Sequence, residues 1–453
     1  MKKRIAVLLA LCLVLLSLSA CADGKKTASN DLSSDNVAEE IASDPSEGEV
    51  EEEEDLSSVP AGTSAAGSKK PGKVTGSSKA SSKAGSKASS KAPSAVSQVP
   101  TGTQVKISYF AAQSIDFSAL RASYSLTAAQ QKVYDELLEG ILESQEAISL
   151  SNSPSGDDVT AAWQVLRNTQ PALYHWNSNA MNMTAKGDTT TFYATYTSES
   201  KAAMDQKVAS ALNEIKLYSG MTAYEMELAV NDWLAERVTY HQAAAAAAGS
   251  KDNPYPNAFT MYGAIVEKKA VCEGYSRAAQ YILGLLGIKS LLITGKADGG
   301  PHMWNMVEID GKWYQLDVTW NDPIYKEGTV DPPPYVHTYF NLTDAMMRKD
   351  HSYAAGGSGD DLNPKAINCT AKDAFYFTKA GRLIGSASEF QRIVAASPKT
   401  KLNSSSYCEF AFATGYSPTL GTLIDSYNSG KPAVAIKGSS TPKAGSQAFY
   451  LKF

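Results

Sequence analysis

The sequence predicts an α+β fold with a central buried helix followed by an antiparallel hairpin, with helices before this core and a small α/β module after it. Three observations predict it. Apolar residues recur at helical spacing in the segment that ends at Gly287. Strand-like runs at 302–309 and 312–319 flank Asp310-Gly311, which is typical of a type I′ hairpin turn. Beyond about residue 356, short strand-like segments replace the long helical ones.

Helical spacing of apolar residues predicts further helices before the core, at 126–150, 157–168, 199–218 and 222–237. Thr127 is placed to cap the first of them. Alternating β-rich residues predict a strand at 189–196, and the alanine run at 243–248 predicts a short helix or a loop insertion. Beyond residue 356 we expect short strands and one helix.

The composition excludes several classes of protein. The 453 residues, 43% of them hydrophobic, are enough to bury a substantial core. A net charge of -5 excludes a basic protein that coats nucleic acid, so no nucleic-acid partner is expected. Five cysteines are too few for a disulfide scaffold, and no Cys/His cluster indicates zinc, so neither a metal nor another cofactor is expected. The one long apolar run lies at the N-terminus, which excludes a polytopic membrane protein.

Residues 1–21 have the pattern of a secretory signal peptide. A positive segment, Lys2-Lys3-Arg4, precedes an apolar stretch from Ile5 to Leu18 that is short for a bilayer span. The stretch ends in Leu18-Ser19-Ala20-Cys21, which resembles the lipobox of bacterial lipoproteins, where the cysteine becomes the lipid-modified first residue. This resemblance implies a lipid anchor on Cys21 and a place on the extracellular face of the bacterial cell membrane. The alternative is ordinary secretion with cleavage nearby.

Residues 22–103 have the composition of a disordered tether. Twelve acidic residues lie between Asp31 and Asp55, and none lies between Leu56 and Thr103, where Ser, Ala, Gly and Lys dominate. Without large hydrophobic side chains, such a segment cannot offset the entropy that ordering costs. A flexible chain of this length reaches roughly 50 Å, so we expect a spacer. Its lysines are also candidates to bind anionic wall polymers or lipid head groups.

Cys272 is placed at the beginning of the central helix, on its buried face. Apolar residues at spacings of four, three and four define that face, which extends back to the cysteine: Tyr275, Ala279, Ile282 and Leu286. The unpaired N–H groups and the dipole at a helix N-terminus favour a thiolate. Glu273 opposes this by charge repulsion, although an acid in the first turn also suits the dipole. A cysteine in this position, taken alone, is more often structural.

His302 and Asp317 are predicted to share one face of the hairpin. A two-residue turn pairs residues whose numbers sum to 621, so His302 faces Thr319 and Trp304 faces Asp317. His302 and Asp317 are then diagonal neighbours, within reach of an imidazole and a carboxylate.

Cys272, His302 and Asp317 together are what a thiol acyltransferase needs. Asp317 would fix the tautomer of His302, and His302 would take the thiol proton and later supply it to the leaving amine. Taken singly, His302 is more often a satisfied strand histidine and Asp317 an edge acid. A zinc site made of the same three residues is a weaker alternative, because structural zinc normally takes four ligands.

Three segments around these residues resemble the signatures of the bacterial transglutaminase-like superfamily. They are Ala270-Val-Cys272-Glu-Gly-Tyr-Ser, His302-Met-Trp-Asn and Leu316-Asp317-Val-Thr-Trp-Asn-Asp-Pro. The resemblance covers roughly residues 222–323, and Tyr339-Phe340-Asn-Leu-Thr-Asp is similar to a segment that often follows the domain in surface proteins. It implies a papain-like α+β core in which the cysteine helix packs on an antiparallel sheet. It also implies Cys272 as nucleophile, His302 as base and Asp317 as the acid that orients the base.

Other residues complete the predicted site. The backbone N–H of Cys272 is the natural oxyanion donor, by analogy with other thiol acyl-transfer sites. Tyr240 precedes the cysteine much as an aromatic donor does in relatives, and it is a candidate second donor or a core residue. Trp304 and Trp313 share the face of His302 and are candidates to wall a substrate cleft, although tryptophans on a sheet are usually core. Asp322 is an alternative candidate to Asp317 for the acid that orients His302. The other histidines have no partner motif and are expected to be structural or on the surface: His175, His241, His337 and His351.

We expect a mainly helical region at 104–221, a catalytic core at 222–355 and a C-terminal module at 356–453. Cys369 and Cys408 in that module form either a disulfide, which leaves Cys272 as the free thiol, or two buried free thiols. The helices between residues 124 and 168 precede the core, which raises the hypothesis that they cover the cleft and hold the enzyme latent.

The expected chemistry is acyl transfer at amide bonds through a thioester on Cys272. Water as acceptor would make a cysteine peptidase, and a lysine amine would make a transglutaminase; the sequence does not choose between them. The substrate would be a protein or peptide, including cell-wall peptides. The alternative is a non-catalytic cell-surface binding protein that retains the fold, which would have no reason to keep Cys272 ionised.

Overall fold

The computed structural model describes residues 102–179, 181–250, 253–324, 335–357, 362–396, 400–402, 405–429, 438–440 and 448–452. The predicted signal peptide with Cys21, and the predicted tether up to residue 101, lie outside these ranges. Among the helices that the structure describes, none has the length and the apolar character that a bilayer crossing demands.

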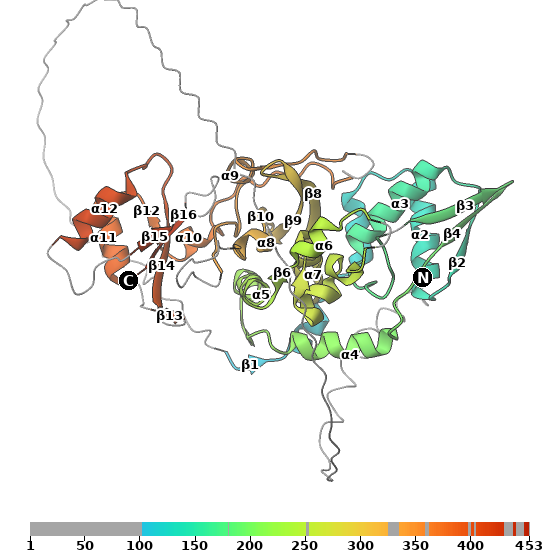
Figure 1. Ribbon diagram of the computed structural model, residues 1–453, viewed down its shortest axis with the longest axis horizontal. Helices are drawn as coiled ribbons and strands as arrows, with labels where there is room; N and C mark the ends of the chain where they lie inside the picture. Colours follow the sequence, from blue (N-terminus) through green and yellow to red (C-terminus); the bar gives the residue numbers. More distant parts are fainter. Residues whose placement is uncertain are drawn as a thin grey trace, which may run out of the picture. The chain divides into compact units, whose positions relative to one another are not determined.

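The centre of the chain is a four-stranded antiparallel sheet with a helix packed on it (Figure 1). The strands lie in the order β10 (Lys312–Leu316), β9 (Gly300–Ile309), β8 (Ser290–Ala297) and β11 (His351–Ser352). Helix α7 (Cys272–Leu285) packs against β8 and β9. The predicted α+β core, with the cysteine helix on an antiparallel sheet, is therefore confirmed.

Short elements surround α7. Helices α5 (Ala223–Arg237) and α8 (Val318–Asn321) pack against it. The others near it are β6 (Thr239–Tyr240), α6 (Gln242–Ala246), η3 (Pro256–Phe259), the π-helical turn η4 (Gly263–Glu267) and β7 (Lys269–Ala270). Gly274 allows α7 to lie close to this layer, since a Cβ there would stand 2.5 Å from the backbone oxygen of Ala258.

The hairpin has the predicted register. Lys312 pairs with Ile309 and Leu316 with Asn305, which is the pairing that a two-residue turn dictates. Asp310 and Gly311 both have positive φ, at 51° and 74°, as a type I′ turn requires. The prediction that the second strand extends to residue 319 is wrong: pairing ends at Leu316, because the Asp317 side chain caps the short helix α8 instead.

A second hydrophobic core comes mostly from residues 124–194 and lies beneath a three-stranded sheet, in the order β2 (Ala147–Leu150), β4 (Thr189–Tyr193) and β3 (Asn182–Lys186). The other N-terminal elements contribute to the central core. The helix expected at 126–150 begins as predicted after Thr127, whose side chain and Gln130 form a capping box, but it ends at Leu142. The helix expected at 199–218 also ends early. The elements are β1 (Gln104–Val105), η1 (Ile107–Gln113), η2 (Phe117–Ser123), α2 (Ala128–Leu142), β2 (Ala147–Leu150), α3 (Gly156–Thr169), β3 (Asn182–Lys186), β4 (Thr189–Tyr193), α4 (Lys201–Leu212) and β5 (Leu217–Tyr218).

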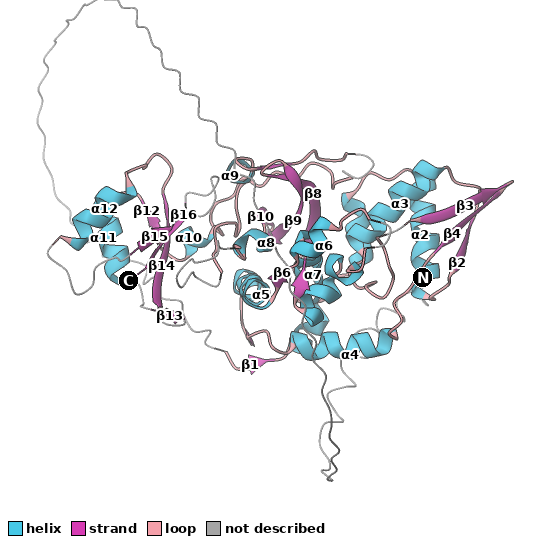
Figure 2. Ribbon diagram, in the orientation of Figure 1, coloured by secondary structure: helices cyan, strands magenta, loops and turns pink. Residues whose placement is uncertain are grey.

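The C-terminal part is a small α/β unit with its own hydrophobic core. Its sheet is mixed, because β12 runs parallel to β14 while the other pairs are antiparallel. Figure 2 shows helices α11 and α12 beside these strands, so the expectation of one helix is wrong. The elements are β12 (Leu383–Ile384), α11 (Ala387–Ala396), β13 (Thr400–Leu402), β14 (Ser405–Phe412), α12 (Leu420–Asn428), β15 (Gly438–Ser440) and β16 (Ala448–Lys452). The preceding helices α9 (Asp344–Met347) and α10 (Tyr376–Lys379) contribute buried residues to the central core instead.

Candidate active site

Cys272 is the first residue of α7, and this end of the helix has no side-chain cap. The preceding residue, Val271, is extended and its side chain has no oxygen to offer to the first-turn N–H groups. Cys272 itself is half-buried and free. The thiol therefore stands next to backbone N–H groups that can bind a developing negative charge.

Two hydrogen bonds join the cysteine helix to the strand of His302. The Ser276 hydroxyl lies 2.9 Å from the backbone oxygen of Met303, and the Asn305 amide donates to the backbone oxygen of Ser276 at 3.0 Å. Ser276 and Asn305 are both buried. Ser276 lies in the same sequence segment as Cys272, and Asn305 in the same segment as His302. The two segments thus contain both the reacting side chains and the residues that set the position of the thiol relative to the imidazole.

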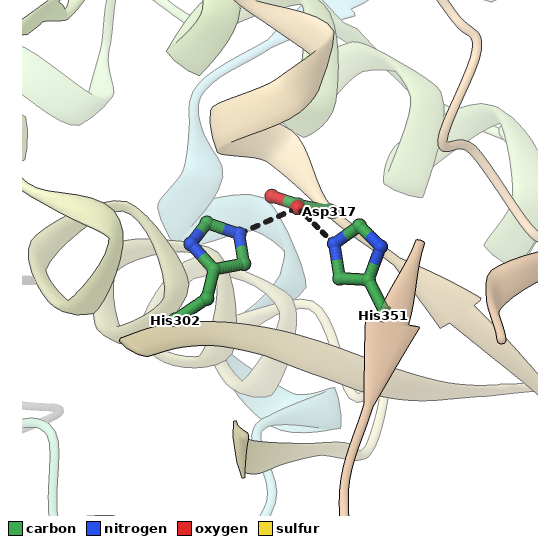
Figure 3. A group of neighbouring side chains, drawn as sticks. All are labelled: His302, Asp317 and His351. Atoms are coloured by element: carbon green, nitrogen blue, oxygen red, sulfur yellow. Dashed lines mark hydrogen bonds and ion pairs between the residues drawn. The ribbon is translucent and has the colours of Figure 1, made fainter. Parts of the chain in front are cut away.

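His302 and Asp317 meet as the hairpin geometry predicts. The Nε2–H of His302 donates to Asp317 Oδ2 at 2.7 Å, and both side chains are buried (Figure 3). Burial lowers the pKa of His302, but the Asp317 carboxylate and Cys272 outweigh it and raise the pKa to about 10. Because Nε2 is engaged with Asp317, Nδ1 is the ring nitrogen left to exchange a proton with Cys272.

Asp317 is fully buried yet remains ionised. Burial raises its pKa, but His302 and His351 outweigh this and hold the pKa well below its usual range. Its second oxygen, Oδ1, accepts from the backbone N–H of Trp320 at 3.1 Å, and its own N–H donates to the backbone oxygen of Tyr339. Hydrogen bonds of this kind limit the directions in which the carboxylate can point.

His351 is part of the site, contrary to the expectation that it has no partner. Its Nε2–H donates to the same Asp317 oxygen at 3.1 Å, and its Nδ1 lies 2.6 Å from Asp350 Oδ1. Figure 3 shows the two imidazoles on opposite sides of the carboxylate. The sequence signal that could have found it is weak: an Asp-His pair follows shortly after the Tyr339 segment.

The same three side chains have the residue types of a metal site, since their ligand atoms lie within 4.8 Å of one another. Both imidazoles, however, bond directly to one oxygen of Asp317. A metal ion between them would have to break both bonds. Cys272 is not in this group, so the zinc alternative built on Cys272, His302 and Asp317 gains no support.

Glu273 does not act as an unbalanced negative charge beside the thiol. Its Oε1 lies 2.7 Å from a guanidinium nitrogen of Arg167 and 2.8 Å from one of Arg277. Burial raises the pKa of Glu273, but the two guanidinium groups outweigh it and lower the pKa. Arg167 lies on α3, so the N-terminal region contacts the residue next to Cys272 while the cysteine stays half-exposed.

Tyr240 is placed near the nucleophile. It pairs with Ala270 in the short parallel ladder of β6 and β7, which ends two residues before Cys272. Burial, with smaller contributions from Cys272 and Asp317, raises the pKa of Tyr240 to about 12. Its hydroxyl therefore keeps its proton at neutral pH and is able to donate it in a hydrogen bond.

The two predicted cleft tryptophans differ. Trp304 is fully buried and its indole N–H donates to Gln315, so its assignment to a cleft wall is wrong. Trp313 is half-buried on the same face, but it lies near the turn, about 13 Å along the strand from Asp317. Sequence reasoning missed Trp320, whose ring lies 5.7 Å from that of His302 and 4.5 Å from that of His351.

Asp322 is not an alternative partner for His302. Its carboxylate accepts from the Tyr275 hydroxyl at 2.6 Å, and burial raises its pKa to about 6. The remaining histidines are structural. His175 is buried, His241 caps α6, and His337 lies between Asp232 and Glu409.

Cys369 and Cys408 are buried and are not joined in a disulfide, which decides between the two alternatives that the sequence left open. They belong to different hydrophobic cores, Cys369 to that of the central region and Cys408 to that of the C-terminal unit.

Part of the chain is similar to known proteins. Residues 210–318 match the family model of the transglutaminase-like superfamily. The chain is 25% identical over 169 residues to kyphoscoliosis peptidase of Homo sapiens, an alignment that covers 33% of the chain and 23% of the relative. The Mus musculus protein is 25% identical over 165 residues, or 32% of the chain and 23% of the relative. The chain thus spans about a quarter of the length of these relatives. A crystal structure of a TGase aligns with 34% of this chain and 46% of its own, at 18% identity and a TM-score of 0.25.

Proposed function

We propose that the transglutaminase-like domain of this chain catalyses acyl transfer at amide bonds through a thioester on Cys272. The observation that carries the proposal is the buried 2.7 Å hydrogen bond between His302 Nε2 and Asp317 Oδ2, beside a free cysteine at an uncapped helix N-terminus. The family match supports a cysteine enzyme of this class.

The first half of the reaction forms the thioester. His302 Nδ1 holds the proton of the Cys272 thiol before the attack, and the thiolate sulfur attacks the carbonyl carbon of the substrate amide. The backbone N–H of Cys272 and the Tyr240 hydroxyl donate to the oxyanion. As the C–N bond breaks, the imidazolium returns the proton to the leaving amine. Asp317 stabilises the imidazolium throughout by accepting from Nε2.

The second half releases the acyl group to an acceptor. Water or an amine gives a proton to His302 and attacks the thioester carbonyl; the C–S bond then breaks and the proton returns to the sulfur. Water yields a carboxylic acid, and a lysine amine yields a cross-link. The name of the peptidase relatives favours hydrolysis.

We further propose that the enzyme acts outside the cell on proteins or peptides, cell-wall peptides among them, while anchored through a lipid on Cys21. The basic and apolar segments at residues 2–18 and the Leu18-Ser19-Ala20-Cys21 sequence support this. Mass spectrometry of the N-terminal peptide from cells that express the full chain tests it. A diacylglyceryl group on Cys21 is expected, and an unmodified peptide that retains residues 1–21 would contradict the anchor.

Reaction of the purified full chain with p-nitrophenyl acetate tests the chemistry. We expect a burst of about one p-nitrophenolate per chain, with an acetyl group on Cys272 found by peptide mapping. Cys272→Ala and His302→Ala should abolish the burst, whereas His241→Ala, which changes a half-exposed histidine outside the site, should retain it. Addition of lysine then separates transfer to amines from hydrolysis. Absence of a burst in the wild-type chain would reject the proposal and favour a binding protein.

A further inference from the structure

We propose that His351 is a positioning residue of this site: through Asp317, it holds the imidazole of His302 in the orientation that proton transfer with Cys272 requires. The inference rests on the proposed function, because it assigns His351 a role in the same reaction. It goes beyond a Cys-His-Asp triad by adding a second histidine to the carboxylate.

The first step of the argument is that both imidazoles share one oxygen. Asp317 Oδ2 accepts from His302 Nε2 at 2.7 Å and from His351 Nε2 at 3.1 Å. A carboxylate held by His302 and the Trp320 N–H alone could still swing about its side-chain torsions. The bond from His351 comes from the opposite side of the oxygen (Figure 3), so it opposes such a swing.

The second step is that His351 is itself held on its other nitrogen. Its Nδ1 lies 2.6 Å from Asp350 Oδ1, and the Tyr339 hydroxyl donates to Asp350 Oδ2 at 2.7 Å. The backbone oxygen of Tyr339 accepts from the N–H of Asp317, which closes a ring of contacts that begins and ends at Asp317. His351 is fixed at both ring nitrogens, which is more than core packing requires.

The third step is that the sheet brings the two histidines to one face. His302 pairs with Gly295 of β8, and His351 pairs with Ala297 of the same strand. The glycine matters because a Cβ at position 295 would stand 2.8 Å from Trp304 and 2.2 Å from the backbone oxygen of Ser352. An absent side chain therefore lets Trp304 and β11 lie close enough for both imidazoles to reach Asp317.

Imidazoles and carboxylates alternate along the hydrogen-bonded groups of His302, Asp317, His351 and Asp350. The groups that face His351 are the carboxylates of Asp317 and Asp350, the imidazole of His302, and the aromatic rings of Trp304, Trp320 and Tyr339. Asp350 balances the positive charge that a doubly protonated His351 brings next to His302. Asp317 is thus left able to stabilise the His302 imidazolium.

Two substitutions separate positioning from packing. His351→Phe keeps an aromatic ring of similar size for its ring neighbours but removes both N–H groups, whereas His351→Gln retains one donor that can reach Asp317. The readout is the rate at which iodoacetamide alkylates Cys272 in the full chain, mapped by peptide, at about pH 6 and about pH 9.

We expect His351→Phe to lower the alkylation rate about tenfold at pH 6, where the thiolate depends on the imidazolium, and less than about twofold at pH 9. His351→Gln should recover most of the loss at pH 6. Equal rates for wild type and folded His351→Phe at both pH values would overturn the inference. Slow labelling of the wild-type chain at pH 6 would instead reject the proposed function, so the two failures are distinguishable.

A measurement on the unaltered chain covers the case in which His351→Phe does not fold. The chain has five histidines, so ¹⁵N-histidine NMR spectra are simple to assign. We expect protons on Nε2 of both His302 and His351, each with the downfield shift of a charge-assisted hydrogen bond. A neutral His351 with an unprotonated Nε2 would overturn the inference whatever the enzyme does.

Discussion

The side-chain amide of Asn305 donates to the backbone oxygen of Ser276 at 3.0 Å, and this bond joins the strand of His302 to the helix of Cys272. The same amide also donates to the Ser290 hydroxyl at 3.0 Å. Asn305 is fully buried, so neither bond can be replaced by bulk water. The residue therefore connects the two halves of the candidate site.

Asn305→Ala is expected to cost about 1–3 kcal/mol of unfolding free energy and to slow Cys272 alkylation about tenfold or more, because the helix is free to move relative to the strand. Denaturant unfolding and alkylation kinetics measure the two effects. Asn363→Ala is the matched control. It removes a buried side chain that bonds Thr294 and Ala354, so stability should fall while alkylation stays fast. Wild-type alkylation in Asn305→Ala would contradict the coupling.

Tyr240→Phe tests the oxyanion assignment, since it removes only the hydroxyl. We expect the rate of acetyl transfer from p-nitrophenyl acetate to fall about tenfold to a thousandfold, with the alkylation of Cys272 little changed. Tyr255→Phe, at an exposed tyrosine whose ring lies 4.5 Å from that of His241, serves as the control. A parallel loss of alkylation would show that Tyr240 supports the fold or the thiolate rather than the oxyanion.

His175→Phe should flatten the acid side of the stability profile. Burial lowers the pKa of His175 in the folded state to about 4. Because the pKa is lower in the folded state than in the unfolded state, the free energy of unfolding is highest above about pH 6.5. It falls by on the order of 3 kcal/mol as the pH drops toward 4. Phenylalanine keeps the stack on Tyr196 and has no such dependence. Chemical denaturation between these pH values measures it; parallel profiles for the two proteins would contradict the prediction.

Glu409→Gln should weaken the attachment of the C-terminal unit to the core. The Glu409 carboxylate accepts from the His337 backbone N–H at 2.6 Å and lies 2.8 Å from its Nδ1, while His337 Nε2 lies 3.0 Å from Asp232. Burial lowers the pKa of His337, but Glu409 and Asp232 raise it to about 10. Because the pKa is raised in the folded state, the stabilisation that the ion pairs of His337 contribute is fully present below about pH 6.5. It is lost as the pH rises toward 10.

Limited proteolysis at neutral pH checks this prediction. Cleavage between the core and residue 405 should be faster in Glu409→Gln than in the wild type, and the difference should shrink near pH 10. Glu389→Gln, which changes an acid that bonds Gly385 within the C-terminal unit, should not accelerate cleavage. Equal cleavage of the wild type and Glu409→Gln would show that other contacts hold the unit in place.

Local signals made much of the fold predictable. The Asp310-Gly311 turn fixes the hairpin register because positive φ at both positions leaves one pairing. Thr127 marks a helix start because its side chain accepts a hydrogen bond from the backbone N–H of Gln130. The end of that helix could not be foreseen, since Ile148 and Leu150 continue the apolar spacing but lie in a strand whose alternate residues are buried.

The rest of the site depends on contacts between distant segments. His351 reaches Asp317 from a two-residue edge strand, which is too short to have a sequence pattern of its own. The complete burial of Trp304 could not be predicted either. The alternation of side chains along a strand assigns each residue to a face of the sheet, but it does not tell whether another layer covers that face. His302 and Asp317 were predictable because a tight turn makes their relationship local.

The residues around Asp317 enter the polypeptide in the order Cys272, His302, Asp317, His351. During synthesis the thiol-bearing helix therefore leaves the ribosome first, and the edge strand that completes the hydrogen bonds to Asp317 leaves last. A nascent chain that stops short of residue 351 carries Cys272 but lacks the hydrogen bond from His351 to Asp317. Under the proposed mechanism, a chain therefore becomes competent for the chemistry only after residue 351 has been synthesised and β11 has joined the sheet.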